Sequence, residues 1–173
     1  LLYGHPESIE PAVIKTIASH GNLCSYLDIP IQHASDAVLR RMGRRYGRQD
    51  LQRLFGRIRD TIPGVALRTT LIVGFPGETE SDFETLMDFI QAERFNHVGV
   101  FTYSDADDLA SHGLPDHVSP RVARRRRDRL MRLQQGISRR INAGYAGQTL
   151  PVLLEERSEP GVLVGRTAFQ APE

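Results

Sequence analysis

A short apolar segment followed at once by a glycine-proline-glycine turn constrains this chain more than any other feature. Residues 71–73 form a branched apolar run that is too short for a helix, which predicts a strand buried on both faces, as in a parallel sheet. Gly74 and Gly77 permit a sharp turn, and Thr79, with Asp82 three residues later, predicts the capped start of a helix. A strand, a tight turn and a helix in this order are typical of α/β proteins, at ligand sites and at purely structural turns alike.

Strand and helix alternate on both sides of this turn. Helices are expected over residues 9–19, with Ser8 as cap, and then from about residues 35, 48 and 80. Strands are expected over residues 1–3, 25–31, 65–73 and 97–103, followed by a polar loop over 104–117. Regular alternation with short connections predicts a parallel sheet with helices outside it.

The chain changes character at Pro120. A long helix is expected from there to about Tyr145, with an apolar stripe at Leu130, Leu133, Ile137 and Ile141. Arginines crowd its other faces: Arg121, Arg124, Arg125, Arg126, Arg127, Arg129, Arg132, Arg139 and Arg140. This charge fits either an ordinary solvated face or contact with RNA or a ribosomal surface. Two strands are expected after it, over residues 149–155 and 162–167.

Composition excludes several classes of protein. The 173 residues, 40% hydrophobic, suit one domain of ordinary size, and the net charge of +1 is carried by arginine with Lys15 as the only lysine. We find neither an apolar run long enough for a membrane span nor a secretion signal, so a cytoplasmic protein without membrane contact is expected. Cys24, the single cysteine, excludes an internal disulfide and is expected to be a buried small hydrophobe.

Four segments in order resemble one family. They are residues 26–35 (YLDIPIQHAS), 41–45 (RMGRR), 67–79 (LRTTLIVGFPGET) and 100–104 (VFTYS). Together they resemble the radical S-adenosylmethionine (radical SAM) methylthiotransferases over nearly the whole chain. The IQHAS and LRTT segments resemble the RimO type, which methylthiolates an aspartate of the twelfth small-subunit ribosomal protein. The tRNA-modifying (MiaB-type) relatives usually carry Ser-Gly after the glutamine and an aspartate where this chain has Thr70, and they remain the nearer alternative.

The resemblance implies a fold and a division of the chain. The fold class is α/β: a partial (β/α) barrel of the radical SAM type with a small, incomplete β appendage that resembles the start of a TRAM domain. Residues 1–118 would be the C-terminal part of the barrel, 119–146 an arginine-rich connecting helix, and 147–173 the N-terminal part of the TRAM-like domain. The site would lie at the C-terminal ends of the strands.

The resemblance also implies which residues bind the cofactor. Gln32 would hydrogen-bond the methionine or ribose part of S-adenosylmethionine, and Arg44 would pair with its carboxylate. Thr70 would lie near the ribose, Ile72 would press on the adenine, and the backbone of Tyr103 and Ser104 would read its edge. A structural role remains open for each of the first four, and His33 is either structural or close to the substrate. No residue of this chain is expected to be catalytic or to ligate a metal.

The cofactors implied are S-adenosylmethionine and two [4Fe–4S] clusters, reduced by an electron donor. The family's CxxxCxxC triad and three further cysteines would lie before Leu1, so this chain alone should be inactive. A chain cut at both ends would expose a sheet edge and could form an edge-mediated dimer. Two other functions remain open: a non-catalytic module that binds RNA or the ribosome, and an unrelated barrel enzyme with a phosphate-bearing ligand at the Gly74–Gly77 turn.

Overall fold

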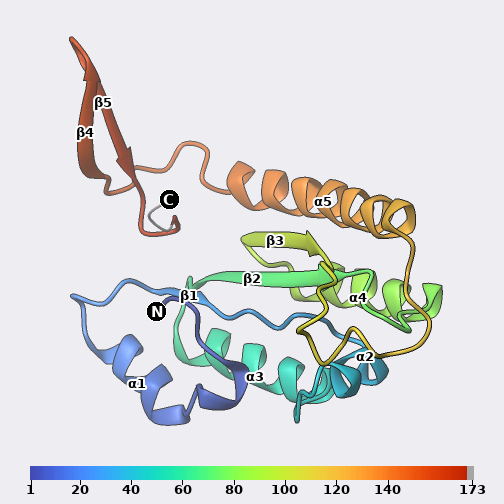
Figure 1. Ribbon diagram of the computed structural model, residues 1–173. Helices are drawn as coiled ribbons and strands as arrows, with labels where there is room; N and C mark the ends of the chain where they lie inside the picture. Colours follow the sequence, from blue (N-terminus) through green and yellow to red (C-terminus); the bar gives the residue numbers. More distant parts are fainter. Residues whose placement is uncertain (171–173) are drawn as a thin grey trace.

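The structure, a computed structural model, describes residues 1–170 as one α/β unit with a projecting hairpin (Figure 1). Residues 171–173, the end of the predicted TRAM-like segment 147–173, lie outside the described residues. In chain order the elements are η1 (Pro6–Ser8), α1 (Pro11–Ser19), β1 (Tyr26–Asp28), α2 (Asp36–Arg41), α3 (Arg48–Thr61), β2 (Ala66–Val73), α4 (Glu80–Glu93), β3 (His97–Thr102), α5 (Pro120–Ala143), β4 (Leu153–Glu159) and β5 (Val162–Arg166).

The main sheet is parallel, in the order β1-β2-β3, as the alternation of elements predicts. Residues 1–3 are not assigned to a strand, yet Leu1 pairs beside β1 in a parallel pattern. Its amino group donates to Tyr26 O (2.9 Å) and its carbonyl accepts from Asp28 N (3.0 Å). Gly4 N also donates to Asp28 O (2.8 Å), so the expected N-terminal strand is present only as these backbone hydrogen bonds to β1.

The two faces of the central strand differ. Leu67, Leu71 and Val73 of β2 are buried in the core with side chains of α1, α3, α4 and α5. Arg68, Thr70 and Ile72, which point to the opposite face, are only partly buried. The prediction that residues 71–73 are buried on both faces is thus wrong for Ile72, because the described helices cover one face of the sheet and leave the other open.

Three aromatic rings fix α3 and α4 against each other. The Phe55 ring of α3 meets the Phe95 ring edge-on at 4.8 Å between centroids, and the Phe89 ring of α4 lies 6.5 Å from Phe55. All three are fully buried. Edge-to-face pairs of this kind add about 0.5–1.5 kcal/mol beyond the area that they bury. This cluster holds α3, which precedes β2, against α4, which follows it.

Two local predictions are corrected by the structure. Ser8 belongs to η1 and does not cap α1, which begins at Pro11 after Glu10, since proline is well suited to the first helical position. Cys24 is exposed, because it lies in the turn before β1 and its side chain does not enter the core. The cap of α4 is as predicted: Thr79 Oγ1 accepts from Asp82 N, and Asp82 accepts from Thr79 N.

The long helix α5 packs along β3 and α4 (Figure 1). Leu130 and Ile137 are fully buried on its inner face, as the periodicity predicts. Gln134 is buried with them and donates to Phe95 O (2.8 Å). The helix ends at Ala143, two residues before the predicted end at Tyr145.

The hairpin β4–β5 is antiparallel and stands away from the main unit (Figure 1). Both strands are exposed up to the last residue of β5, and their exposed side chains include Leu153, Leu154 and Leu163. The chain after the hairpin returns to the main unit, where the Phe169 ring stacks on Tyr145 at 4.6 Å and its carbonyl lies 2.7 Å from His97 Nε2. None of the helices formed by residues 1–170 has the length and apolar character that crossing a membrane requires.

Candidate functional site

A cleft of about 640 Å³ lies at the C-terminal ends of β1 and β2. Parallel α/β sheets bind ligands at this end of their strands. Its walls come from the segment after β1, the end of α2, the end of β2 and the loop after β3. The lining residues are Gln32, Arg41, Met42, Gly43, Arg44, Ile72, Phe75, Leu109, Ala110, Ser111 and Leu114.

Gln32 is fixed by the backbone on both sides. Its N–H donates to Thr70 O (3.0 Å) and its carbonyl accepts from Ile72 N (2.8 Å). Its φ is +66°, a value that residues other than glycine rarely adopt, and this pairing holds it there. The side chain lines the cleft, so the amide that was predicted to bind the cofactor is placed by β2 itself.

Arg44 is placed by the C-terminal cap of α2. Gly43, with φ +71°, ends the helix in a Schellman motif: Gly43 N donates to Arg40 O (3.0 Å) and Arg44 N donates to Leu39 O (2.9 Å). The Arg44 side chain then lines the cleft, with Nη1 3.4 Å from His5 Nε2. Its Nε is buried and has no hydrogen-bond partner among residues 1–170. A buried donor of this kind is suited to a ligand oxygen.

Arg41, which the sequence reasoning missed, adds a second guanidinium to the cleft. Its Nη1 donates to Pro76 O at 3.4 Å, so it lies against the Gly-Pro-Gly turn. A Cβ at Gly77 would lie 1.1 Å from Arg41 Nη1, so the flexible end of the Arg41 side chain would have to move if Gly77 were replaced. The cleft is therefore electropositive on the side of α2.

Ile72 and Thr70 lie on the same face of β2, but only Ile72 reaches the cleft. Thr70 pairs in register with Gly99 of β3, and a Cβ at Gly99 would lie 3.7 Å from Thr70 Oγ1. Thr70 therefore lies on the open face of the sheet beside β3, two residues before Ile72 and outside the cleft.

Tyr103 and Ser104 follow β3 at the same edge of the sheet and do not line the cleft. Tyr103 N donates to Val73 O (2.8 Å), which leaves its carbonyl as the backbone group that could read an adenine. The Tyr103 hydroxyl donates to Asp105 Oδ1 (2.9 Å) and lies 2.8 Å from Oγ of Ser111, a residue that does line the cleft. Three of the six predicted binding residues thus line the cleft: Gln32, Arg44 and Ile72.

A buried polar network lies behind the turn, and the sequence reasoning did not identify it. Glu78 accepts from the backbone N–H groups of Gly74 and Phe75 with Oε2, and its Oε1 lies 3.2 Å from Arg126 Nη1 of α5. Its side chain is completely buried and that of Arg126 is 5% exposed. Helical spacing gave the signal for Arg126, which shares the buried face with Ala123, Leu130 and Ile137.

His33 belongs to the same network and is fully buried. Its Nδ1 accepts from Ser35 N (2.9 Å), so a neutral ring carries its proton on Nε2, which faces Glu78 Oε1 at 3.9 Å. Ser35 in turn donates to Asp82 (2.5 Å). Burial raises the pKa of Asp82, but hydrogen bonds from Ser35 and Thr79 outweigh it and hold that pKa below its ordinary value. His33 is buried behind the cleft wall, which fits the structural role among the two that the sequence left open.

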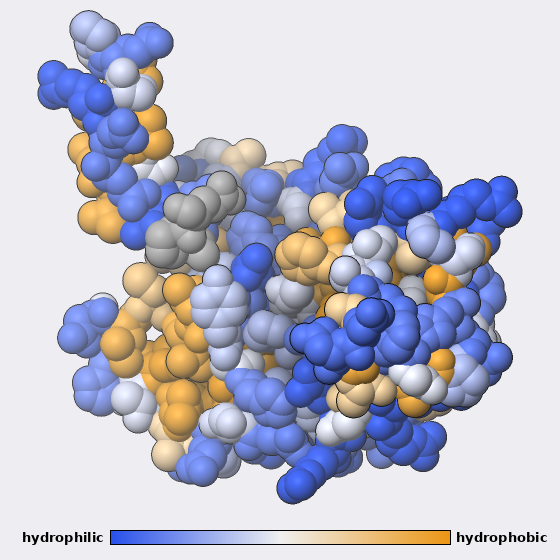
Figure 2. All heavy atoms as spheres, viewed as in Figure 1, coloured by the Kyte–Doolittle hydropathy of each residue, from blue (hydrophilic) through white to orange (hydrophobic). Residues whose placement is uncertain are grey.

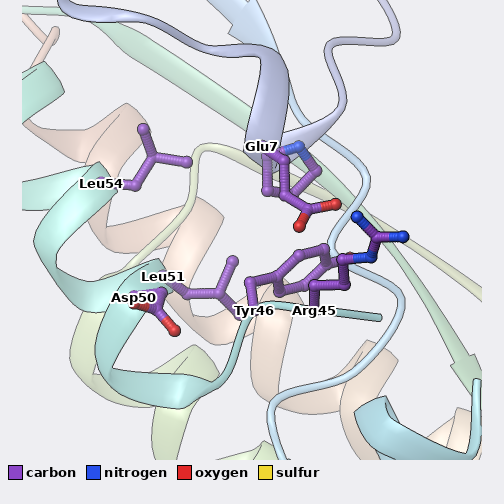
Figure 3. Close-up of a pocket in the computed structure, with 7 residues that line it drawn as sticks. Glu7, Arg45, Tyr46, Asp50, Leu51 and Leu54 are labelled. Carbon is purple, nitrogen blue, oxygen red and sulfur yellow. The ribbon is translucent and has the colours of Figure 1, made fainter. Parts of the chain in front are cut away.

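A second, smaller hollow of about 320 Å³ lies between η1 and α3 and contains none of the predicted residues. Figure 3 shows Glu7 and Arg45 on one side of it and Leu51 and Leu54 on the other. Tyr46, at its floor, donates to Ile31 O (3.2 Å), and burial raises the pKa of this hydroxyl to about 12. This hollow carries a structural tyrosine and no convergent set of ligand-binding groups.

Comparison with known proteins identifies the family. Residues 4–90 match the family model of the radical SAM superfamily. The chain belongs to this superfamily. The match ends within α4 and includes Gln32, Arg44, Thr70 and Ile72.

Several relatives match the chain over its whole length or nearly so. The chain is 53% identical over all 173 residues to the ribosomal protein uS12 methylthiotransferase RimO of Desulfosudis oleivorans, of which it covers 39%. It is 44% identical over its whole length to the RimO of Clostridioides difficile, again covering 39%, and 45% identical over 172 residues to that of Synechococcus sp. CC9605, covering 38%. These matches confirm the resemblance to the RimO type. The chain spans about two fifths of the length of these relatives.

The residues that line the cleft match the chemical groups of S-adenosylmethionine. S-adenosylmethionine needs an acceptor or donor for its amino acid end, an apolar surface for adenine and a cation for its carboxylate. The cleft offers the Gln32 amide, the Ile72 and Phe75 side chains and the buried, unpartnered Arg44 Nε. These residues fit the cofactor.

The sequence does not contain the set of cysteines that an iron–sulfur cluster requires. The sequence has one cysteine, Cys24, which is exposed and lies outside the cleft. No group of three or more histidine, cysteine or acidic side chains that could hold a metal occurs within residues 1–170. Any cluster of a radical SAM protein that contains this chain would have to be ligated by other residues.

Proposed function

We propose that this chain is the cofactor-binding part of a radical SAM methylthiotransferase of the RimO type. One observation carries the proposal: Gln32, Arg44 and Ile72, predicted from the motifs alone, line one cleft at the C-terminal ends of the parallel strands. The proposed substrate is an aspartate side chain of ribosomal protein uS12, the protein named for the relatives. The enzyme would be a transferase of the cytoplasm.

Each cofactor-binding residue has a proposed role. Arg44 would hold the carboxylate of S-adenosylmethionine through its guanidinium, helped by the positive charge of Arg41. Gln32 would hydrogen-bond the methionine or ribose part, and Ile72 and Phe75 would cover the adenine. Thr70 would support the ribose side from the open face of β2, and the carbonyl of Tyr103 with the backbone of Ser104 would lie toward the adenine edge.

When bound to a reduced cluster, S-adenosylmethionine supplies the radical that removes hydrogen from the substrate carbon. The chain's own contribution is to bind and orient this cofactor and to exclude water with the loop that carries Leu109 and Leu114. The two [4Fe–4S] clusters and the docking surface of an electron donor would belong to the rest of the protein, so this chain alone would be inactive.

We further propose that the sheet is part of a (β/α) barrel. The open face of β2, with Arg68, Thr70 and Ile72 partly exposed, is the expected interior of such a barrel. Residues 1–118 would form the barrel segment, 119–146 the connecting helix, and 147–173 the start of a TRAM domain. The remainder of that domain would cover the exposed apolar side chains of β4 and β5.

The apolar edge beside β1 would be covered by further barrel strands. Leu1 and Leu2 are nearly half exposed there, and Figure 2 shows hydrophobic surface over the adjoining α1. If this chain is isolated, the same edge would pair with a second copy. Light scattering of the isolated chain measures this: a dimer that Leu1→Lys converts to a monomer supports edge pairing.

The test of function uses the intact protein with reconstituted clusters, S-adenosylmethionine and a reductant under anaerobic conditions. One reaction contains small ribosomal subunits and a second contains unmodified tRNA. Mass spectrometry of uS12 peptides should find one methylthio group on an aspartate, with the tRNA nucleosides unchanged. A methylthiolated adenosine in the tRNA with unmodified uS12 would instead establish the MiaB-type alternative.

A further inference from the structure

Most arginines of α5 have no acidic partner. Arg126 pairs with Glu78, Arg129 bridges Glu80 and Glu84 (2.6 Å each), and Arg127 pairs with Asp128 (2.9 Å), the only acidic residue of this helix. The other six have no carboxylate within 4 Å in the part of the chain that the structure describes. They are Arg121, Arg124, Arg125, Arg132, Arg139 and Arg140.

Four of these six lie on one line along the helix. At about 100° per residue, Arg125, Arg132 and Arg139 lie within about 40° of Arg121 around the helix axis. With a rise of about 1.5 Å per residue, the line from Arg121 to Arg139 is about 27 Å long. We call these four residues the arginine stripe.

The packing of α5 fixes which way the arginine stripe faces. Ala123, Leu130 and Ile137 anchor the opposite face of α5 in the core, and Arg126 ties the same face to the turn at Glu78. The helix therefore cannot rotate to bury or pair the stripe, which faces solvent along α5. Figure 2 shows a hydrophilic surface over this part of the molecule.

The stripe is not explained by the stability of the helix. Arg121 lies in the first turn, which contains no acidic residue, although the helix dipole disfavours cations there. Arg121 and Arg125 are four residues apart, a spacing at which like charges destabilise a helix. A helix that needed only a solvated face would gain from acidic residues at these positions.

We propose that the arginine stripe binds the sugar-phosphate backbone of an RNA strand. A row of unpaired guanidinium groups on a rigid helix is complementary to a row of phosphates, and guanidinium suits phosphate geometry. The exposed positions between the arginines carry Asp128 and Gln135, with no aromatic or large apolar side chain. A protein partner would need such anchors. The choice of RNA over DNA rests on the proposed function, which places the protein at a ribosomal particle; the stripe itself does not.

The test measures binding of the intact protein to a fluorescently labelled 20-nucleotide RNA by anisotropy over a series of salt concentrations. The stripe variant replaces Arg121, Arg125, Arg132 and Arg139 with glutamine. The control variant removes the same number of charges elsewhere, by replacing the exposed Arg40, Arg53, Arg57 and Arg94 with glutamine. Circular dichroism of both variants establishes that they are folded.

The stripe variant should bind the RNA at least tenfold more weakly than wild type. Its slope of log affinity against log salt should be smaller by about 3, because each lost phosphate contact removes about 0.7–0.9 from the slope. The control variant should keep most of the affinity and nearly the whole slope. A DNA strand of the same sequence should bind more weakly than the RNA.

Three results would overturn the proposal: equal losses in the two variants, tighter binding of DNA than of RNA, or stripe-dependent binding of an acidic peptide without binding of RNA. The outcome is separable from the proposed function, because S-adenosylmethionine binding and uS12 modification are measured in different assays. If the protein fails to bind S-adenosylmethionine or to modify uS12 but still binds RNA through the stripe, only the proposed methylthiotransferase function is refuted.

Discussion

Arg126 Nη1 lies 3.2 Å from Glu78 Oε1, and both side chains are buried. The same guanidinium nitrogen donates to Glu78 O (3.0 Å), while the other carboxylate oxygen of Glu78 accepts from the N–H groups of Gly74 and Phe75. Glu78 therefore joins the turn at the cleft to α5, which leads to the hairpin. The pair satisfies the backbone of a turn whose residue Phe75 lines the cleft.

Replacing Arg126 with methionine should destabilise the protein by about 3–5 kcal/mol, because the Glu78 carboxylate would remain buried without its cation. Urea unfolding measures this loss. Arg125→Met is the matched control, since Arg125 is exposed on the same helix and its replacement should change the free energy of unfolding by no more than about 0.5 kcal/mol.

A double-mutant cycle with Glu78→Gln separates the pair from general packing. If the two residues stabilise each other, the double variant should lose clearly less than the sum of the two single losses. Additive losses would show that Arg126 acts through its other contacts, which are Glu80 Oε2 at 3.3 Å from Nη2 and the Phe83 ring at 5.6 Å from the guanidinium carbon.

Three glycines with positive φ allow backbone strain to be separated from steric contact. A Cβ at Gly64 (φ +71°) meets nothing within 4 Å, one at Gly77 (φ +77°) meets the mobile end of Arg41, and one at Gly74 (φ +82°) lies 2.5 Å from Ala123 Cβ of α5. Gly64→Ala should cost about 1 kcal/mol from the backbone alone. Gly77→Ala should cost slightly more, and Gly74→Ala the most, because α5 cannot move away.

The free energies of unfolding of these variants test this order. Adding Ala123→Gly to Gly74→Ala should recover part of the loss, whereas adding it to Gly64→Ala should not. Equal losses at Gly64 and Gly74 would contradict the close contact between the turn and α5.

The sequence predicted those parts of the fold that local patterns specify. The alternation of elements, the Thr79–Asp82 cap, and the core positions Leu51, Leu54, Phe55 and Ile58 are all found in the structure. The errors come where tertiary surroundings decide. Ile72 was expected to be buried because its neighbours are apolar, but the sequence pattern cannot say that one face of the sheet stays open.

The candidate site was predictable only in part, because local sequence patterns mark some of its residues and not others. Gln32 and Arg44 belong to motifs, and a Schellman cap recognisable from Gly43 places Arg44 at the cleft. Arg41 was missed because its partner, Pro76 O, is distant in sequence. Glu78 was missed because its buried cation, Arg126, comes from α5, and no local pattern marks such a pair. Arg126 was hidden among nine arginines, although helical spacing places it with the buried residues of α5.

Arg44→Lys should weaken the binding of S-adenosylmethionine by about 10- to 100-fold in the intact protein, because lysine keeps the charge but not the planar fork. Equilibrium dialysis with labelled cofactor measures this directly and needs no turnover. Arg45→Lys is the control, since the neighbouring Arg45 lines the other hollow and should leave the affinity unchanged. Equal affinities of both variants and wild type would remove Arg44 from the site.

The stability of the protein should decrease in alkali through Tyr46. Burial raises the pKa of this hydroxyl from its ordinary 10.0 to about 12, so the unfolded state loses the proton first as the pH rises. The stabilisation is therefore complete below pH 10 and is lost between pH 10 and pH 12.

Tyr46→Phe should cost about 1 kcal/mol at neutral pH, from the lost hydrogen bond to Ile31 O, and the difference from wild type should shrink as the pH approaches 12. Urea midpoints measured across this range test the prediction, with Tyr3→Phe as the exposed control; a difference that stays constant with pH would show that the Tyr46 hydroxyl is not the titrating group.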